Sequence, residues 1–313
     1  MEIIIFLTSL LVSGLLNMLF QREFIKRGVL DKINIRSSHK SLATRSGGSS
    51  LFSSLLLISI FFYLSNNEIY DFSLLIPISI MLVVGLYDDV YKLDFKLKFI
   101  FQIIVAKIII DNGLIIDNLH GIFGVFELSR ILGQLFTIFI IVAIINSINF
   151  IDGIDGLAIS VIALFLLSFE LFSSNLSDMF FLTLIILGSV IPLYFFNFRK
   201  KNKVFLGDSG SLFLGTVVSI YVLKILSQDY SIKPYYDLNK VIFVISILSY
   251  PIFDIIRIFF LRLYKKKSPF LPDKQHIHHL ILSRTYNHFK TTLIIVFFSI
   301  ITIFIVQVAN LVF

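Results

Sequence analysis

The stretch Asn146–Leu157, which reads N-S-I-N-F-I-D-G-I-D-G-L, decides how this chain must be organised. It places two carboxylates, two side-chain amides and two glycines between two apolar runs that are each long enough to cross a bilayer. Charge at the end of a membrane span is costly to keep dry and usually marks a functional site. We therefore expect this segment to break the helical run and to line a wet cavity.

The composition makes the bilayer the solvent of this protein. Hydrophobic residues form 57% of the 313 residues, charged residues form 15%, and the mean hydropathy is +0.92. A soluble domain would carry about 25% charged residues. The absence of cysteine excludes disulfides, thiolate metal sites and a cysteine nucleophile. The net charge of +7 is not a sign of nucleic-acid binding, and we expect no nucleic-acid partner.

Ten apolar segments are predicted to span the lipid bilayer, so the expected fold is an all-α integral membrane protein with one polytopic domain, residues 1–313. The segments are 2–20, 50–64, 72–87, 99–116, 131–147, 157–172, 179–196, 211–226, 240–261 and 291–312. The first has no preceding basic region or cleavage site, so we interpret it as a retained helix rather than a signal peptide. The weakest is 99–116, which carries Gln102, Lys107 and Asp111.

The basic residues are distributed asymmetrically between the loops. Five loops, the odd ones in chain order, hold 21 of the 27 Lys and Arg residues, whereas the even loops hold only Arg130 and Lys233. The odd loops are 21–49, 88–98, 148–156, 197–210 and 262–290. By the positive-inside rule the odd loops are cytoplasmic and both termini lie outside. Topology and contact with lipid headgroups would account for the charges, but not for the acidic, amide and histidine clusters in the same loops.

In loop three, oxygen-bearing side chains recur at every third position, at Asn146, Asn149, Asp152 and Asp155. On a helix they would lie along one face. Such oxygens suit Mg²⁺, which binds a few protein groups together with substrate phosphates, and they could also accept hydrogen bonds from a nucleobase or ribose. Helix caps and Asx turns are the structural alternative, but two such residues would suffice for caps, so we favour a site.

Loops two and four contribute further carboxylates. Asp208 lies in F-L-G-D-S-G-S, residues 205–211, where small neighbours would let a phosphate and a metal approach the backbone. Capping of the next helix by Asp208 is the alternative. Asp88 and Asp89 end the third span, and Lys98 follows. Because adjacent residues do not share a helix face, we expect one carboxylate in the site and the other in support, unless both are simply interfacial.

Loop five contains His276, His278 and His279, which suggest zinc at first sight. The i, i+4 spacing of helical zinc sites is missing, and no cysteine or nearby Glu completes a ligand set. We favour ring N–H groups that donate to phosphate oxygens, with a structural loop as the alternative. In the ninth span Asp254 and Arg257 are three residues apart, and we expect them to neutralise each other.

Loop one offers basic, hydroxyl and glycine groups that suit a phosphate or a sugar. Together the five loops resemble the polyprenyl-phosphate N-acetylhexosamine-1-phosphate transferases, of glycosyltransferase family 4 type. The matching segments are D-x4-RSSH-x4-TRSGG from Asp31, the Asp88-Asp89 pair with Lys98, N-S-I-N-F-I-D-G-I-D-G-L-A, K-V-F-L-G-D-S-G-S and S-P-F-L-P-D-K-Q-H-I-H-H. Loop one departs from the family pattern at Ile33 and Ala43, where proline is usual.

The resemblance implies transfer of a sugar-1-phosphate from a UDP-N-acetylhexosamine to undecaprenyl phosphate, with release of UMP. It implies that Asp208 and Asn149 bind Mg²⁺ (or Mn²⁺), and that Asp88 binds or deprotonates the lipid phosphate with Asp89 in support. The groups expected to bind the nucleotide sugar are Asp152, Asp155, Asn146, Lys98, His276, His278, His279, Arg36, His39 and Arg45. The implied location is the bacterial inner membrane, where a homodimer is one compatible assembly.

Two alternatives stay open at this point. The branch that transfers a muramoyl-pentapeptide phosphate starts peptidoglycan, but by resemblance its histidines are consecutive. The histidine loop of this chain is similar to the branch that starts O-antigen, common-antigen or teichoic-type glycans, which favours UDP-N-acetylglucosamine or a related donor. A membrane transporter also uses broken helices and buried charges, but its site usually lies near the midplane between repeats. No repeat is visible here, so we favour the enzyme.

Overall fold

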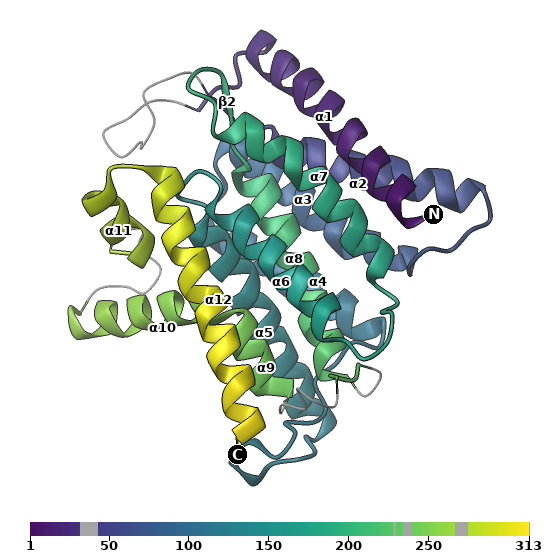
Figure 1. The fold of residues 1–313 in the computed structure, drawn as a ribbon, viewed down its shortest axis with the longest axis vertical. Helices are drawn as coiled ribbons and strands as arrows, with labels where there is room; N and C mark the ends of the chain where they lie inside the picture. Colours follow the sequence, from purple (N-terminus) through teal and green to yellow (C-terminus); the bar gives the residue numbers. More distant parts are fainter. Residues whose placement is uncertain (32–42, 228–229, 234–239, 267–274, 313) are drawn as a thin grey trace.

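A computed structural model of the chain describes residues 1–31, 43–227, 230–233, 240–266 and 275–312 as a mostly helical protein (Figure 1). The helices are α1 (Glu2–Lys26), α2 (Gly47–Leu64), α3 (Leu75–Tyr91), α4 (Phe95–Asp111), α5 (Arg130–Ile151), α6 (Leu157–Phe172), α7 (Phe180–Asn197), α8 (Gly207–Leu226), α9 (Lys240–Ile247), α10 (Ser249–Tyr264), α11 (Ile277–Thr285) and α12 (His288–Val312). The remaining elements are the 3-10 turns η1 (Phe72–Leu74) and η2 (Ile122–Gly124) and the strands β1 (Ala43–Thr44) and β2 (Lys203–Val204).

Every predicted span falls on one or more of these helices, but not all of the helices have the length of a membrane span. Among the described residues, seven helices are long and apolar enough to cross a membrane, and α9 with α10 could form an eighth span. Two further predicted spans correspond to α4 and α6, which have 17 and 16 residues and fall below that length. The chain is thus a multi-pass membrane protein, and the number of ten spans stays a prediction.

Helix α8 forms the centre of the bundle. Of the 18-residue apolar stretch of α8, 94% is buried inside the protein. The helices that pack against it are α2, α3, α5, α6 and α9. Glycines make this possible, because a Cβ added at Gly215 would lie 2.9 Å from the Cα of Ile145 on α5. Similarly, a Cβ at Gly210 would lie 3.0 Å from the Cα of Gly48 on α2. Such small residues allow close contact between membrane helices, and they fix the first turn of α8 between its neighbours.

The ninth predicted span is not one straight helix. The chain bends by 82° between α9 and α10, and in Figure 1 α10 projects sideways from the bundle. Pro251 lies in the first turn of α10, where its ring would clash with the carbonyl four residues earlier if α9 continued. The helix therefore breaks before the proline. Loop five also contains a helix that we did not predict, α11, which packs against α12.

Candidate active site

Loops one and four are joined by a short parallel sheet. Strand β1 pairs with β2 so that Ala43 lies opposite Lys203. Beyond the strands, the backbone N–H groups of Gly47 and Gly48 donate to the carbonyls of Phe205 and Leu206 at 3.0 and 2.9 Å. This pairing places the start of α2 beside the start of α8, although about 160 residues separate them in the chain.

Asp89 holds the first turn of α8 from the neighbouring helix α3. Its carboxylate accepts hydrogen bonds from the backbone N–H groups of Asp208 (3.0 Å) and Ser209 (2.9 Å). These N–H groups belong to the orphan donors at a helix N-terminus, which a carboxylate satisfies well. The alternative considered above, in which Asp208 itself caps α8, is wrong: the cap position is Leu206 and it makes no side-chain bond.

A glycine on α3 allows the capping contact of Asp89. Gly85 lies one helical turn before Asp89, and a Cβ there would lie 2.5 Å from both the N and the Cα of Ser209. Any larger residue would therefore push α3 away from the backbone of α8. The two N–H groups of α8 could then no longer reach the carboxylate on α3.

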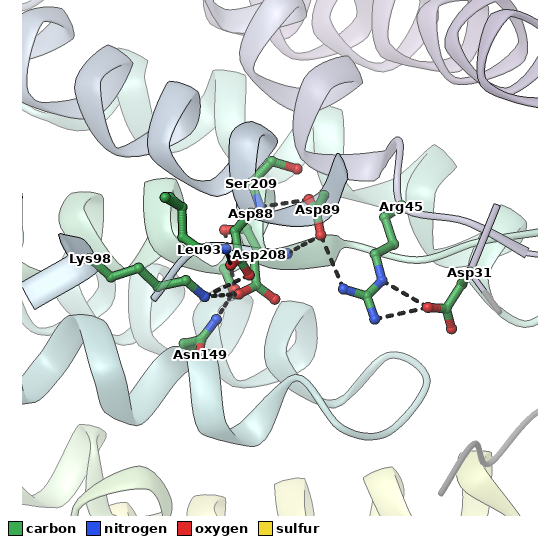
Figure 2. Close-up of polar contacts among 10 residues, drawn as sticks. Asp31, Arg45, Asp88, Asp89, Leu93, Lys98, Asn149, Asp208 and Ser209 are labelled. Atoms are coloured by element: carbon green, nitrogen blue, oxygen red, sulfur yellow. Dashed lines mark hydrogen bonds and ion pairs between the residues drawn. The ribbon is translucent and has the colours of Figure 1, made fainter. Parts of the chain in front are cut away.

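Lys98 lies between two carboxylates at the centre of the site (Figure 2). Its Nζ is 2.6 Å from Oδ2 of Asp88 and 2.5 Å from Oδ2 of Asp208. The second oxygen of Asp88 accepts a bond from the backbone N–H of Leu93 at 2.6 Å, which fixes the carboxylate at the end of α3. Asp88 and Asp89 thus face different partners, as the rotation of about 100° between helix neighbours requires.

The oxygen donors around Lys98 also fit a divalent cation. The ammonium group of Lys98 lies between Asp88 and Asp208, which shows that this position suits a cation. Asn149 of α5 donates from Nδ2 to Oγ of Ser211, in the first turn of α8, at 2.8 Å, so its amide lies against the same helix end as Asp208. Two carboxylates and an amide oxygen are the kind of donors that Mg²⁺ or Mn²⁺ prefers.

Arg45 adds positive charge on the other side of Asp89. Its Nη2 is 2.8 Å from Oδ1 of Asp31, and its Nη1 is 3.4 Å from Oδ1 of Asp89. Burial opposes the charge, but the carboxylates of Asp31 and Asp89 outweigh it and raise the pKa of the Arg45 guanidinium. The other two predicted residues of loop one, Arg36 and His39, lie outside the described residues.

Asn146 lies one turn below Asn149 and contacts α4 rather than the charged centre. Its Nδ2 donates to Oε1 of Gln102 at 2.8 Å, and Nε2 of Gln102 donates back to Oδ1 at 3.3 Å. Lys98 lies one turn before Gln102 on α4, and Asn149 lies one turn after Asn146 on α5. The amide pair therefore joins α4 to α5 one turn away from Lys98 and Asn149, and a ligand role for Asn146 stays a prediction.

The two carboxylates after α5 lie in different surroundings. Asp152 borders a small cavity together with Gly156 and Asn197, and burial with the charges of Asp208 and Asp89 raises its pKa well above the usual range. The break expected in this segment is present, since α5 ends at Ile151 and α6 begins at Leu157.

Asp155 is held by a lysine and a histidine that come from different elements. Its carboxylate pairs with Lys203 of β2 and with Nδ1 of His288 on α12. Burial disfavours the charged form, but His288 and Lys203 outweigh it and lower the pKa of Asp155. The carboxylate thus joins loop three, loop four and α12.

The three histidines of loop five pack against the same segment of loop three. A Cβ added at Gly153 would lie 3.0 Å from Nε2 of His278 and 3.4 Å from Cε1 of His279, and the ring of His276 lies 5.8 Å from that of Phe150. Burial and the neighbouring His279 lower the pKa of His278 to about 3. His278 is therefore neutral at physiological pH.

One predicted pairing is wrong. Asp254 does not neutralise Arg257: its Oδ2 accepts from Nδ1 of His276 at 2.6 Å, while Arg257 donates to the backbone carbonyl of Gln275. Sequence reasoning missed this role because the bend before α10 turns Asp254 toward loop five. It also missed Gln102, Lys203 and His288, whose partners lie on other helices or loops and leave no local pattern.

Asp254, His276 and His278 bring potential ligand atoms within 4.8 Å of one another. In the sequence no cysteine or nearby Glu completes a ligand set with the histidines, but the fold brings the carboxylate of Asp254 beside them. Asp254 and His276 already bond to each other, and Nδ1 of His278 lies 2.8 Å from the hydroxyl of Tyr250. In this structure the group is a hydrogen-bonded cluster, and the preference for phosphate over zinc stays a prediction.

Comparison with known proteins agrees with the resemblance. The profile of glycosyl transferase family 4 matches residues 71–226. An undecaprenyl-phosphate α-N-acetylglucosaminyl 1-phosphate transferase of Pasteurella multocida strain Pm70 is 36% identical, over 88% of this chain and 78% of the relative. A probable undecaprenyl-phosphate N-acetylglucosaminyl 1-phosphate transferase of Bacillus subtilis strain 168 is 33% identical, over 94% and 80%. With a carboxylate centre built from the loops that carry the resemblance, this chain belongs to glycosyl transferase family 4.

Proposed function

We propose that this enzyme transfers N-acetylglucosamine-1-phosphate, or the 1-phosphate of a related N-acetylhexosamine, from its UDP donor to undecaprenyl phosphate. The observation that carries the proposal is the meeting of Asp88, Lys98 and Asp208 at the start of α8. Phosphoryl transfer depends mainly on positioning and on neutralising charge, and these residues offer both. The names of the relatives supply the sugar and the lipid.

In the proposed reaction an oxygen of the lipid phosphate attacks the phosphorus next to the sugar. A new P–O bond forms to the lipid phosphate, the bond to UMP breaks, and UMP leaves with the electron pair. Asp88 is proposed to orient the lipid phosphate and to accept its proton. Lys98, which pairs with Asp88 and Asp208, would neutralise phosphate charge, and Asp89 would support both by keeping α8 in place.

Asp208 and Asn149 are the proposed ligands of Mg²⁺ or Mn²⁺, which when bound neutralises negative charge on the diphosphate. Their support is the oxygen chemistry of the donors and the cationic position that the ammonium of Lys98 takes between the carboxylates. We expect excess chelator to abolish UMP release and added Mg²⁺ or Mn²⁺ to restore it. Full activity in the chelator would refute the metal assignment.

The nucleotide end of the donor is proposed to lie along loop three. Asn146 lies on α5, which also carries Asn149, and Asp152 directly follows that helix. Asp155 is already paired with Lys203 and His288, so it would act by holding the loop in shape. His276, His278, His279 and Arg45 are proposed to bind donor phosphates. Arg36 and His39 are proposed to contact the sugar or its phosphates, on the sequence pattern alone.

The donor is tested by measuring UMP release from purified protein with undecaprenyl phosphate and Mg²⁺. We expect turnover with UDP-N-acetylglucosamine or another UDP-N-acetylhexosamine and none with UDP-muramoyl-pentapeptide. Release from the muramoyl donor alone would move the chain to the peptidoglycan branch. No release from any donor would refute the reaction and favour the transporter alternative. Initiation of an O-antigen, common-antigen or teichoic-type glycan follows only from the first result.

The proposed location is the bacterial cytoplasmic membrane, with the site facing the cytoplasm and both termini outside. The support is the concentration of Lys and Arg in the five loops that form the site. Single cysteines introduced near each terminus and in residues 262–290 report this directly, since the chain has none of its own. Labelling of residues 262–290 by an impermeant reagent in intact cells would overturn the orientation.

A further inference from the structure

Asp254 is a buried carboxylate whose charge the proposed reaction does not use directly. It is 1% exposed and lies on α10, just beyond the bend. Its Oδ2 accepts from Nδ1 of His276 at 2.6 Å, and its Oδ1 accepts from the backbone N–H of Ile277 at 2.8 Å. Among the described residues, His276 is the only ionisable side chain that pairs with it. A buried charge needs partners of this kind.

The two contacts require a carboxylate rather than an amide. Both oxygens of Asp254 accept, one from a ring N–H and one from a backbone N–H. An ionised carboxylate is an acceptor on both sides, whereas an asparagine offers only one acceptor. The carboxylate accepts the Nδ1–H of His276, so Nε2 is the ring nitrogen that would face a phosphate, to which it donates when the ring carries a proton on both nitrogens.

The α10 face that carries Asp254 also holds the second histidine. Tyr250 lies one turn earlier, and its hydroxyl is 2.8 Å from Nδ1 of His278. The rings of His276 and His278 stack with their centroids 5.3 Å apart. This stack packs on Phe150 and Gly153, which flank the end of the helix that carries Asn149.

We propose that Asp254 is a positioning residue that orients His276 toward the phosphates of the nucleotide sugar. The inference rests on the proposed function, in which His276 binds the donor. Asp254 itself touches no substrate and acts only through the histidine. The bend before α10 serves to bring this carboxylate from a membrane span to loop five.

The test is a double-mutant cycle of Asp254→Asn and His276→Ala in the purified full chain, read by UMP release at saturating undecaprenyl phosphate. We expect each single variant to lower kcat/KM for the UDP-sugar about 10- to 100-fold, as is usual for residues that orient a ligand. The KM for the lipid should not change. The double variant should be no slower than His276→Ala alone, because asparagine can still accept from Ile277 once the ring is gone. Asp178→Asn, an exposed carboxylate that pairs with Lys224, is the matched control.

A spectroscopic measurement gives a readout that does not depend on turnover. In ¹⁵N-histidine NMR of the chain's six histidines, one ring protonated at Nδ1 should disappear in His276→Ala and shift in Asp254→Asn. Wild-type turnover in Asp254→Asn, multiplied losses in the double variant, or a His276 ring protonated only at Nε2 would each overturn the proposal. A wild-type protein that releases no UMP would instead refute the proposed function, and the NMR result would still decide the orientation of His276.

Discussion

Two buried polar regions of this protein contrast sharply. Along α1 the buried Ser9, Ser13 and Asn17 form a seam against α2 and α7, where Ser13 donates to the carbonyl of Ser189 at 2.7 Å and Ser189 donates to Ser54 at 3.1 Å. Every group named in this seam is neutral. At the start of α8 the polar groups are charged, and they come from helices and loops far apart in the chain (Figure 2).

The contrast separates structural polarity from functional polarity in a membrane protein. Neutral hydroxyls and amides between helices each contribute little, because the unfolded chain in the membrane also finds partners. Two carboxylates that share one ammonium, as Asp88 and Asp208 share Lys98, hold more negative than positive charge. Such a centre is ready to accept a further cation. We therefore expect changes at α8 to affect turnover, and changes in the seam to affect only stability.

The largest effects are expected in the charged region, and Asp208→Asn is the first of them. Loss of one group that stabilises charge in the transition state costs about 10²–10³-fold in kcat. UMP release should fall by that factor while the melting temperature stays near that of the wild type. Asp178→Asn removes an exposed carboxylate paired with Lys224 and should leave turnover unchanged. Equal turnover in the two variants would remove the distinction between the two regions.

Within the charged region, Asp88 and Asp89 are expected to have different roles. Asp88→Asn should lower turnover on the order of 10²–10⁴-fold with little change in stability, because Asp88 is proposed to act on the lipid phosphate. Asp89→Asn should in addition destabilise the fold by about 1–3 kcal/mol, since an amide cannot accept from both N–H groups of α8. Thermal unfolding in detergent, measured beside UMP release, checks both. Identical melting temperatures in the two variants would contradict the capping role of Asp89.

A glycine pair tests whether packing at α8 differs from packing along α1. Gly85→Ala should destabilise the protein by about 1–3 kcal/mol, because its Cβ would lie 2.5 Å from the backbone of Ser209. Gly14→Ala is the matched change on α1, where the Cβ would lie 3.7 Å from Pro192 in ordinary contact. That variant should be neutral or slightly stabilised, since alanine favours helix by about 1 kcal/mol. Melting temperatures give the comparison, and equal losses would contradict it.

The smallest effect is expected within the seam. Ser13→Ala removes the hydrogen bond to the carbonyl of Ser189 and should cost about 0.5–1.5 kcal/mol of stability. Turnover per folded molecule should not change, because the seam contains no ionised group. Activity that fell in Ser13→Ala without a loss of stability would show that the seam takes part in function.

The sequence by itself determined the membrane class, the positions of most helices and the loops that carry chemistry. Apolar runs and charge asymmetry reflect transfer between water and lipid, which depends on composition more than on contacts. The motifs around Asp88, Asn149 and Asp208 were therefore visible along the chain, and so was the expectation that Asp88 and Asp89 differ.

Only the tertiary structure decided which group faces which. The capping of α8 by Asp89, the pairing of Gln102 with Asn146 and the turn of Asp254 away from Arg257 and toward His276 all join separate elements. Such partners leave no periodic trace, because they depend on helix packing and on one proline-induced bend. Local rules placed Asp254 beside Arg257 on one helix, but each of them takes a partner from loop five, His276 for Asp254 and the carbonyl of Gln275 for Arg257.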